Sequence, residues 1–342
     1  MANLKNTQIN DTGFLQLPAG TIAQRPSSPQ EGMIRYNTDF NQTEYYDGSA
    51  WRNIKDFGPK ATGGDAVSNI VVGGIPYTVH YFASTGNSTF TVTKGGEVEY
   101  LIVAGGGGGG GRRGGGGGGG EVNIGTTNLS QGNYSIVVGD GAQDRKGRIL
   151  GDQGSGDNGE NSSAFGITSL GGGGGGGQSD GGKNGGSGGG EGARSSSVGI
   201  STATTGLGND GGNSNSTDRS GGGGGGAGSP GFPTGLKGGD SNSGGDGGNG
   251  ISSSVSGATT FYGGGGGGGA YSGSSLPGDG GLGGGGIGQQ EDPVDSGVSS
   301  KHDGLSNTGG GGGGASGDRS HAAAGIGGSG IVVVRYVNYT TI

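Results

Sequence analysis

Residues 105–120 read GGGGGGGRRGGGGGGG, two unbroken glycine runs separated by Arg112 and Arg113. Four more runs of six or seven glycines follow, in a chain in which 102 of 342 residues are glycine. Glycine loses more backbone freedom on folding than any other residue and has no side chain to bury, so such runs do not form ordinary helices or strands. Their nearly equal lengths indicate rods that lie side by side. The first residues of the six runs, predicted to be structural, are Gly105, Gly114, Gly171, Gly221, Gly263 and Gly309.

The rod that glycine favours is the polyproline-II helix, which has three residues per turn, rises ~3.1 Å per residue and contains no internal hydrogen bonds. The amides and carbonyls of a buried rod need partners, and a bundle supplies them from rod to rod. A flexible linker is the alternative, but linkers usually mix glycine with serine and have no reason for equal lengths. The lack of a Gly-X-Y repeat and a content of only 9 prolines exclude a collagen triple helix.

The composition limits the class of protein. Hydrophobic residues make up 26% of the chain and charged residues 13%, which argues against one conventional core and against a charge-swollen disordered chain. The net charge of −8 offers no basic footprint for nucleic acid. The absence of cysteine excludes disulfides and thiolate metal sites and favours synthesis in a reducing cytoplasm. The sequence predicts neither a signal peptide nor a membrane span.

Residues 1–58 have a pattern of their own and are predicted to form a small N-terminal β module for attachment and oligomerisation. The apolar stretch 13–18 and the alternating segment 33–38 are strand candidates. Asp47-Gly48 lies between two aromatic-rich segments and is a strong hairpin signal. Because a unit this small has little core, we expect it to pack against further copies, most favourably as a homotrimer, or against a partner protein.

Residues 59–140 are predicted to form a β-sandwich platform, because they contain consecutive segments rich in Val, Ile and Tyr. A distant segment, 331–337, has the same character and needs a sheet to join, so we expect the platform to be closed at 330–338, most favourably beside 98–103. The intervening residues 141–329 then form a bundle of polyglycine-II helices with polar connecting loops. The predicted fold is mostly β with polyglycine II and almost no α-helix. The other strand candidates are 70–72, 77–82, 88–92, 122–124 and 134–138.

No catalytic residue is predicted. Ser320-His321 near Asp318 superficially resembles a hydrolase set, but a triad is defined by spatial roles and not by adjacency. A depolymerase would need a cleft with paired carboxylates, and the sequence alone shows no such pair. No cofactor or metal is expected, although a structural Ca²⁺ in Asp- and Asn-containing loops stays open. The loops concerned contain Asp152, Asp157, Asn158 and Glu160, and the segment 244–252, which resembles one repeat of a calcium-binding β-roll.

Two parts of the chain resemble bacteriophage proteins. GFLQLPAG at 13–20, RPSSPQEGMIRYN at 25–37 and YYDGSAW at 45–51 are together similar to a module of phage structural and tail-fibre proteins, particularly marine, cyanophage-like ones. YLIVAGG at 100–106 and GGSGIVVVRY at 327–336 resemble a glycine-rich domain of phage tail proteins. The glycine section is also similar in style to the adhesin at the tip of T-even phage long tail fibres, in which a polyglycine-II sandwich carries receptor-binding loops. That adhesin does not share the N-terminal module or the flanking strands.

The resemblance implies a non-enzymatic tail-fibre or tip adhesin on the virion surface, which binds a glycan or an outer-membrane protein of the host. It also implies that residues 1–58 attach to other tail or capsid proteins. A purely structural virion component, such as a fibre shaft, whisker or capsid decoration protein, is the alternative. An ice-binding protein is a third class, but the runs lack repeated Thr or Ala. The longest polar loops, 178–220 and 270–308, are the expected receptor contacts. Charge and aromaticity are rare in this section, and the candidate contact residues are Arg194, Arg219, Tyr271, Lys301 and His302.

Overall fold

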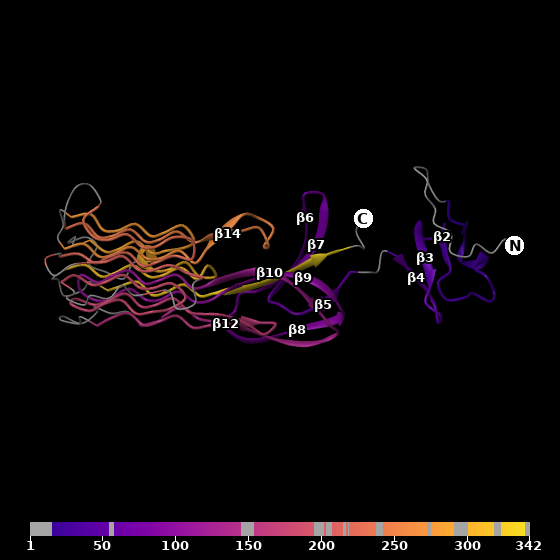
Figure 1. Cartoon of the computed structure of the whole chain (residues 1–342), viewed down its shortest axis with the longest axis horizontal. Coiled ribbons are helices and arrows are strands. Elements are labelled where there is room, and N and C mark those ends of the chain that lie inside the picture. Colours follow the sequence, from indigo (N-terminus) through magenta and orange to yellow (C-terminus); the bar gives the residue numbers. More distant parts are fainter. Residues whose placement is uncertain are drawn as a thin grey trace. The chain divides into compact units, whose positions relative to one another are not determined.

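The chain divides into two compact units, residues 1–58 with 339–342 and residues 59–338. Figure 1 labels the elements along the chain. The described residues form strands and short 3₁₀ helices but no α-helix, and the strand expected at 13–18 lies mostly outside them. The structure is a computed structural model that describes residues 16–54, 58–144, 154–194, 202, 207–214, 217, 219–236, 242–271, 275–290, 300–317 and 323–338.

The first unit contains one four-stranded sheet in the order β1-β2-β3-β4, parallel between β1 and β2 and antiparallel elsewhere. Asp47 forms the turn between β3 and β4, since its Oδ1 accepts the amides of Ser49 and Ala50 at 2.8 and 2.7 Å. The elements of this unit are β1 Ala19–Gly20, the 3₁₀ helix η1 Ile22–Gln24, β2 Ile34–Asn37, β3 Gln42–Tyr46 and β4 Trp51–Asn53.

A polar cluster lies where this unit would otherwise have an apolar core. Among its described residues no hydrophobic side chain is buried, whereas the carboxylate of Glu44 is fully buried. Glu44 accepts hydrogen bonds from Arg25 Nε (3.2 Å) and Asn37 Nδ2 (2.9 Å), and Arg35 Nε lies 3.5 Å from its Oε1. Burial would raise the pKa of Glu44, but the hydrogen bonds from Arg25 and Asn37 prevail and lower it.

The second unit contains two five-stranded sheets, in the orders β10-β9-β16-β7-β6 and β13-β12-β11-β8-β5, and a hairpin, β14-β15. Apolar side chains from both large sheets share one core, which includes Phe82, Phe90, Ile136 and Val332. The mostly β fold predicted from the sequence is confirmed. The elements are β5 Lys60–Thr62, β6 Ala66–Val72, β7 Ile75–Phe82, β8 Gly86–Lys94, β9 Gly96–Val103, β10 Val122–Leu129, β11 Gly132–Val138, β12 Ser162–Ala164, β13 Ile167–Ser169, β14 Ile251–Ser253, β15 Thr260–Tyr262, η3 Ser300–His302 and β16 Ile331–Val337.

The last strand, β16, lies between β9 and β7 and is antiparallel to both. The expected pairing of this segment with 98–103 is therefore confirmed. Its side chains alternate between two cores. Val332 and Val334 pack in the core between the sheets, while Ile331 and Val333 pack in a second core with the hairpin β14-β15. A strand buried on both faces thus joins the two ends of the glycine section in one sheet.

The glycine runs hydrogen bond laterally, with a repeat of three residues. Along the run 105–111, every third amide donates to the same neighbouring segment, so the three sets of amides face three different partners. The partner segments are 154–160, 325–328 and 115–118. Three residues per turn is the repeat of the polyproline-II helix, which has no internal hydrogen bonds and must find all its partners outside itself. The predicted lateral bonding of the rods is confirmed.

The run 114–120 lies in the interior of the bundle. It is bonded on all sides, by donating to three segments and accepting from three others. One neighbour, 222–225, is parallel to it and the other five are antiparallel, which a collagen helix does not permit. This run and the run 105–111 belong to the bundle, although the sequence assigned both to the platform 59–140. The six neighbours are 309–315, 170–176, 222–225, 107–110, 187–190 and 266–269.

Close approach explains why these rods are glycine. A Cβ atom added at Gly107, Gly117 or Gly266 would lie closer than 3.0 Å to a carbonyl oxygen of a neighbouring rod. At the edge of the bundle, where a rod has no neighbour on one side, polar side chains accept the hydrogen bonds of its amides. Oγ of Ser155 and Oδ1 of Asn158 and Asn161 accept amides of the run 171–177 at 2.9–3.2 Å, again three residues apart.

Candidate functional site

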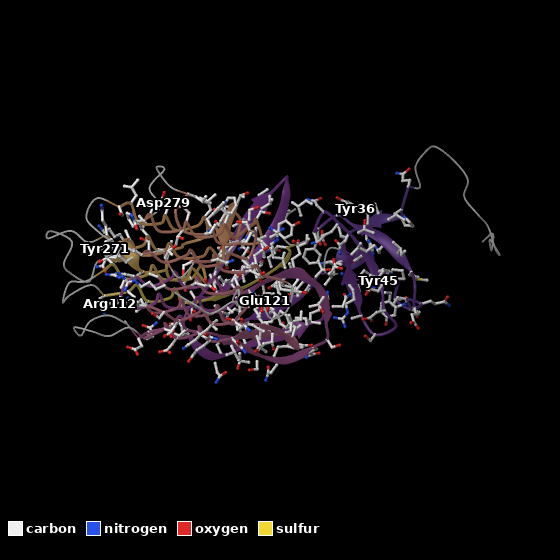
Figure 2. All side chains as sticks on the ribbon, turned by 60° about the vertical axis from the view of Figure 1, so that its left-hand side comes forward. Tyr36, Tyr45, Arg112, Glu121, Tyr271 and Asp279 are labelled. Atoms are coloured by element: carbon white, nitrogen blue, oxygen red, sulfur yellow. The ribbon has the colours of Figure 1, made fainter. Side chains whose placement is uncertain are left out.

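The turn Arg112–Arg113 marks the end of the bundle that is remote from the sheets, which we call the distal end. The run before it leaves β9, and the run after it returns to β10, so the turn lies at the far end of both. Two other segments meet it there, because Arg113 N donates to Ser316 O and Ala193 N donates to Arg113 O. Figure 2 shows Arg112 and Tyr271 near this end, away from Glu121.

Lateral bonds between rods place Arg219 and Tyr271 at the same level. Gly269 N donates to Gly114 O, and Gly221 N donates to Gly269 O. Tyr271 N then donates to the hydroxyl of Ser220 at 3.0 Å. Segments far apart in the sequence are thus held in register by bonds between rod backbones and by the Ser220 hydroxyl.

A cation–aromatic cluster results at the distal end. The guanidinium carbon of Arg113 lies 4.4 Å from the ring centroid of Tyr271, and that of Arg219 lies 4.9 Å from the same centroid. Both distances are within the range of cation–π attraction. We call Arg112, Arg113, Arg194, Arg219 and Tyr271 the distal cluster.

Three of these arginines have left-handed backbones. Their φ angles are 40° for Arg112, 54° for Arg113 and 61° for Arg194. A glycine adopts such angles without penalty, whereas a residue with a Cβ is strained by roughly 1–2 kcal/mol. Glycine would avoid this cost, and the chain has 102 glycines elsewhere. The presence of arginine at these turns therefore indicates that its side chain has a function.

The candidate residues predicted from the sequence separate into two groups. Arg194 and Arg219 are exposed, and no described acidic residue pairs with either of them. Together with Tyr271 they belong to the distal cluster. Lys301 is exposed, but His302 is only 1% exposed, and its Nδ1 lies 2.8 Å from the carbonyl oxygen of Ile287. His302 is therefore an interior residue of the bundle and cannot present its ring to a receptor.

Arg112 and Arg113 were not among the site residues predicted from the sequence. Arg113 is 3% exposed and lies against the ring of Tyr271, so it positions that ring. The sequence did contain a sign of their importance, because this arginine pair is all that separates two runs of seven glycines. What the sequence could not show is that Tyr271 lies beside it.

One carboxylate lies near the cluster in the interior. Glu191 is two residues before Ala193, which bonds to Arg113, and it is 3% exposed. Its Oε2 accepts the amide of Ser214 at 2.8 Å. Burial raises the pKa of Glu191, and the hydrogen bond from Ser214 offsets only part of this effect.

A groove of about 530 Å³ lies elsewhere on the second unit and brings Asp140 and Asp303 to one hollow. These carboxylates hold the chain in place. Oδ1 of Asp140 accepts Gly141 N at 2.9 Å, and Oδ1 of Asp303 accepts Ile326 N at 3.1 Å. The groove is lined mostly by polar residues and glycines, with Ala83, Leu305 and Ile326 as its apolar side chains, and we assign it no chemistry.

The side chains considered above as ligands of a structural Ca²⁺ act, where the structure describes them, as hydrogen-bond acceptors or in an ion pair. Asp157 lies 3.2 Å from Lys183 Nζ, and Asp152 lies outside the described residues. Oδ1 of Asp246 and of Asn249 accept backbone amides at 2.7 and 2.9 Å. Within the described ranges, no three His, Cys, Asp or Glu side chains are grouped as a metal site would require. None of the helices there has the length and apolar character that crossing a membrane needs.

Comparison with known families agrees with this architecture. Residues 83–337 match the model of the glycine-rich domain family. The chain belongs to this family. The match begins directly after β7 and ends with β16, so this glycine-rich domain includes all the runs and the strand that closes the sheet. The first unit and the hairpin β6-β7 lie outside it. No curated protein matches the chain significantly.

Proposed function

We propose that this glycine-rich domain protein is a non-enzymatic tail-fibre or fibre-tip adhesin on a phage virion, which binds a host-surface receptor through its distal end. The observation that carries the proposal is the distal cluster, in which Arg113 and Arg219 flank Tyr271 at 4.4 and 4.9 Å. Arginine and tyrosine are the residue types that most often dominate binding surfaces. The receptor is a glycan or an outer-membrane protein of the host.

The scaffold suits such a role. The rods below the cluster are fixed by backbone bonds on all sides, so side chains at the distal end start from a rigid base. Surface loops tolerate sequence changes better than the elements that they connect, so loops at the rod ends can vary while the rods are kept. This arrangement allows receptor specificity to vary while the fold is kept.

The first unit is the proposed attachment module. Its resemblance to a phage structural module supports a place on the virion surface, with synthesis in the host cytoplasm. Its described residues bury no hydrophobic side chain, so packing against other copies or against tail and capsid proteins would supply apolar burial that it lacks.

A purely structural virion protein is the second candidate. The observation that favours it is the bundle itself, whose lateral bonds would suit a stiff fibre or decoration without any receptor. Receptor binding requires the side chains of the distal cluster, whereas a purely structural role does not.

Particle adsorption to host cells separates the two. Tyr271→Ala and Arg219→Ala particles should adsorb at least about tenfold more slowly, the loss expected when an important contact residue is truncated. Lys183→Ala is the control, because Lys183 is an exposed cation on the bundle flank that pairs with Asp157. If both distal variants fold normally and adsorb as the parent does, the structural role is favoured.

A further inference from the structure

We infer that the distal cluster recognises an anionic polysaccharide, through carboxylate or phosphate groups on its sugars. The inference rests on the proposed function and specifies its receptor. The cluster contains four arginines on a protein whose net charge is −8, so it is not one part of a generally basic surface. Four arginines therefore gather at the end where contact is proposed.

Two of the arginines are available for binding. Arg194 and Arg219 are exposed, and the described part of the chain gives neither an acidic partner. The guanidinium group is a planar fork whose donors match the two oxygens of a carboxylate or phosphate. An anionic group is therefore the ligand chemistry that these side chains fit.

The cluster is also held together before any ligand arrives. Arg219 and Arg113 both lie within 4.9 Å of the centroid of Tyr271, although like charges repel each other. An anion bound beside the exposed Arg219 is attracted by its guanidinium group. Ala193 is bonded to Arg113, which keeps the neighbouring Arg194 at the same end.

The preference for a polysaccharide comes from Tyr271. Its ring is half-buried, and a tyrosine of this kind offers a rigid apolar face together with a hydroxyl group. Sugar rings present apolar C–H faces beside polar substituents, so an acidic sugar fits a tyrosine between arginines. An acidic peptide satisfies the charges but does not need the ring.

Binding of the intact protein to immobilised polymers tests the inference. The probes are polygalacturonate, which carries carboxylates, phosphorylated dextran, which carries phosphates, unmodified dextran and polyglutamate. The parent protein should bind at least one anionic polysaccharide, more weakly as salt rises, and should not bind dextran. The preferred polymer identifies the anionic group.

The variant is Arg194→Gln with Arg219→Gln, which should bind the preferred polymer at least about tenfold more weakly. The matched control is Lys60→Gln with Lys183→Gln, which removes the same charge away from the distal cluster. Tyr271→Leu should weaken polysaccharide binding, and Tyr271→Phe should retain most of it. Equal binding to dextran, preference for polyglutamate, or equal losses in the two double variants would overturn the inference.

The same variants in the adsorption assay separate this inference from the proposed function. Reduced adsorption with no polymer binding would leave the adhesin role in place and refute the anionic polysaccharide. Arginine-dependent polymer binding with normal adsorption would support the ligand chemistry and refute the role in host attachment.

Discussion

The hydroxyl group of Tyr336 lies 3.2 Å from Nε2 of His80, although the two residues are 256 positions apart in the sequence. The same hydroxyl accepts the amide of Ala61 at 3.2 Å, and Nδ1 of His80 lies 2.7 Å from the carbonyl oxygen of Gly63. One tyrosine of the closing strand therefore links segments of both large sheets.

Stability should decrease as the pH falls below about 6.5, the usual pKa of histidine. Burial lowers the pKa of His80, and the bond to Gly63 only partly opposes this. Because the unfolded chain binds the proton more tightly, the stabilisation is complete above the unfolded pKa and is lost as pH falls through the folded one. Urea denaturation between about pH 7.5 and 5.5 measures the slope. His80→Gln should flatten it, and identical slopes would refute the prediction.

Both sheets should depend on β16. Deleting residues 331–342 removes the central strand, so the truncated protein should lose β structure in circular dichroism and become sensitive to protease. Val332→Ala, at a fully buried position, should cost about 2 kcal/mol of unfolding free energy. Val71→Ala is the control at a position that is 70% exposed, and should cost less than about 0.5 kcal/mol. A folded, protease-resistant truncation would contradict the central role of β16.

Two adjacent glycines in one rod should differ sharply in how much stability is lost when each is replaced by alanine. A Cβ at Gly107 would lie closer than 3.0 Å to the carbonyl oxygen of Gly173, whereas at Gly108 the nearest atom is the Cβ of Ala142 at 3.3 Å. Gly107→Ala should therefore destabilise by about 3 kcal/mol or more, and Gly108→Ala by about 1 kcal/mol or less. Chemical denaturation of both variants measures the difference. Equal losses would mean that the rods can move apart.

Glu191→Gln should stabilise the protein at neutral pH. Burial raises the pKa of Glu191, so this group favours the folded state in full below its unfolded pKa of about 4.3, and the contribution is lost as pH rises through the folded value. Glutamine keeps an oxygen for the amide of Ser214 without the buried charge. The gain in melting temperature should be larger at pH 7 than at pH 4. A loss at pH 7 would show that Glu191 has a compensating cation.

Assembly through the first unit should yield a homotrimer. The described residues 16–54 bury no hydrophobic side chain, and shared packing with other copies would provide a core and present three distal ends for multivalent attachment. Light scattering of the full chain at micromolar concentration measures its mass. A stable monomer would refute the trimer and leave attachment to a partner protein as the proposed role of this unit.

Much of the fold could be predicted from local patterns. The Val-, Ile- and Tyr-rich segments became β6–β11, extended by a few residues at their ends, and 331–337 joined the sheet because such a strand has no other partner. Unbroken glycine at 105–111 excluded ordinary helices and strands. The candidate site could be predicted only in part. Arg219 and Tyr271 were identified because charged and aromatic residues are rare, whereas His302 was misjudged because a polar loop gives no sign that its histidine is buried.

Backbone freedom and β propensity are local properties, so the sequence was enough to predict that rods exist and that the strands on either side of them share a sheet. Which rods are neighbours follows only from the three-dimensional fold. A polyglycine rod has no side chains to encode its partners, so register follows from the whole set of lateral bonds. That register brings Arg113 to within 4.4 Å of the Tyr271 centroid, and it makes Gly107 intolerant of a methyl group that Gly108 accommodates with a small shift of Ala142.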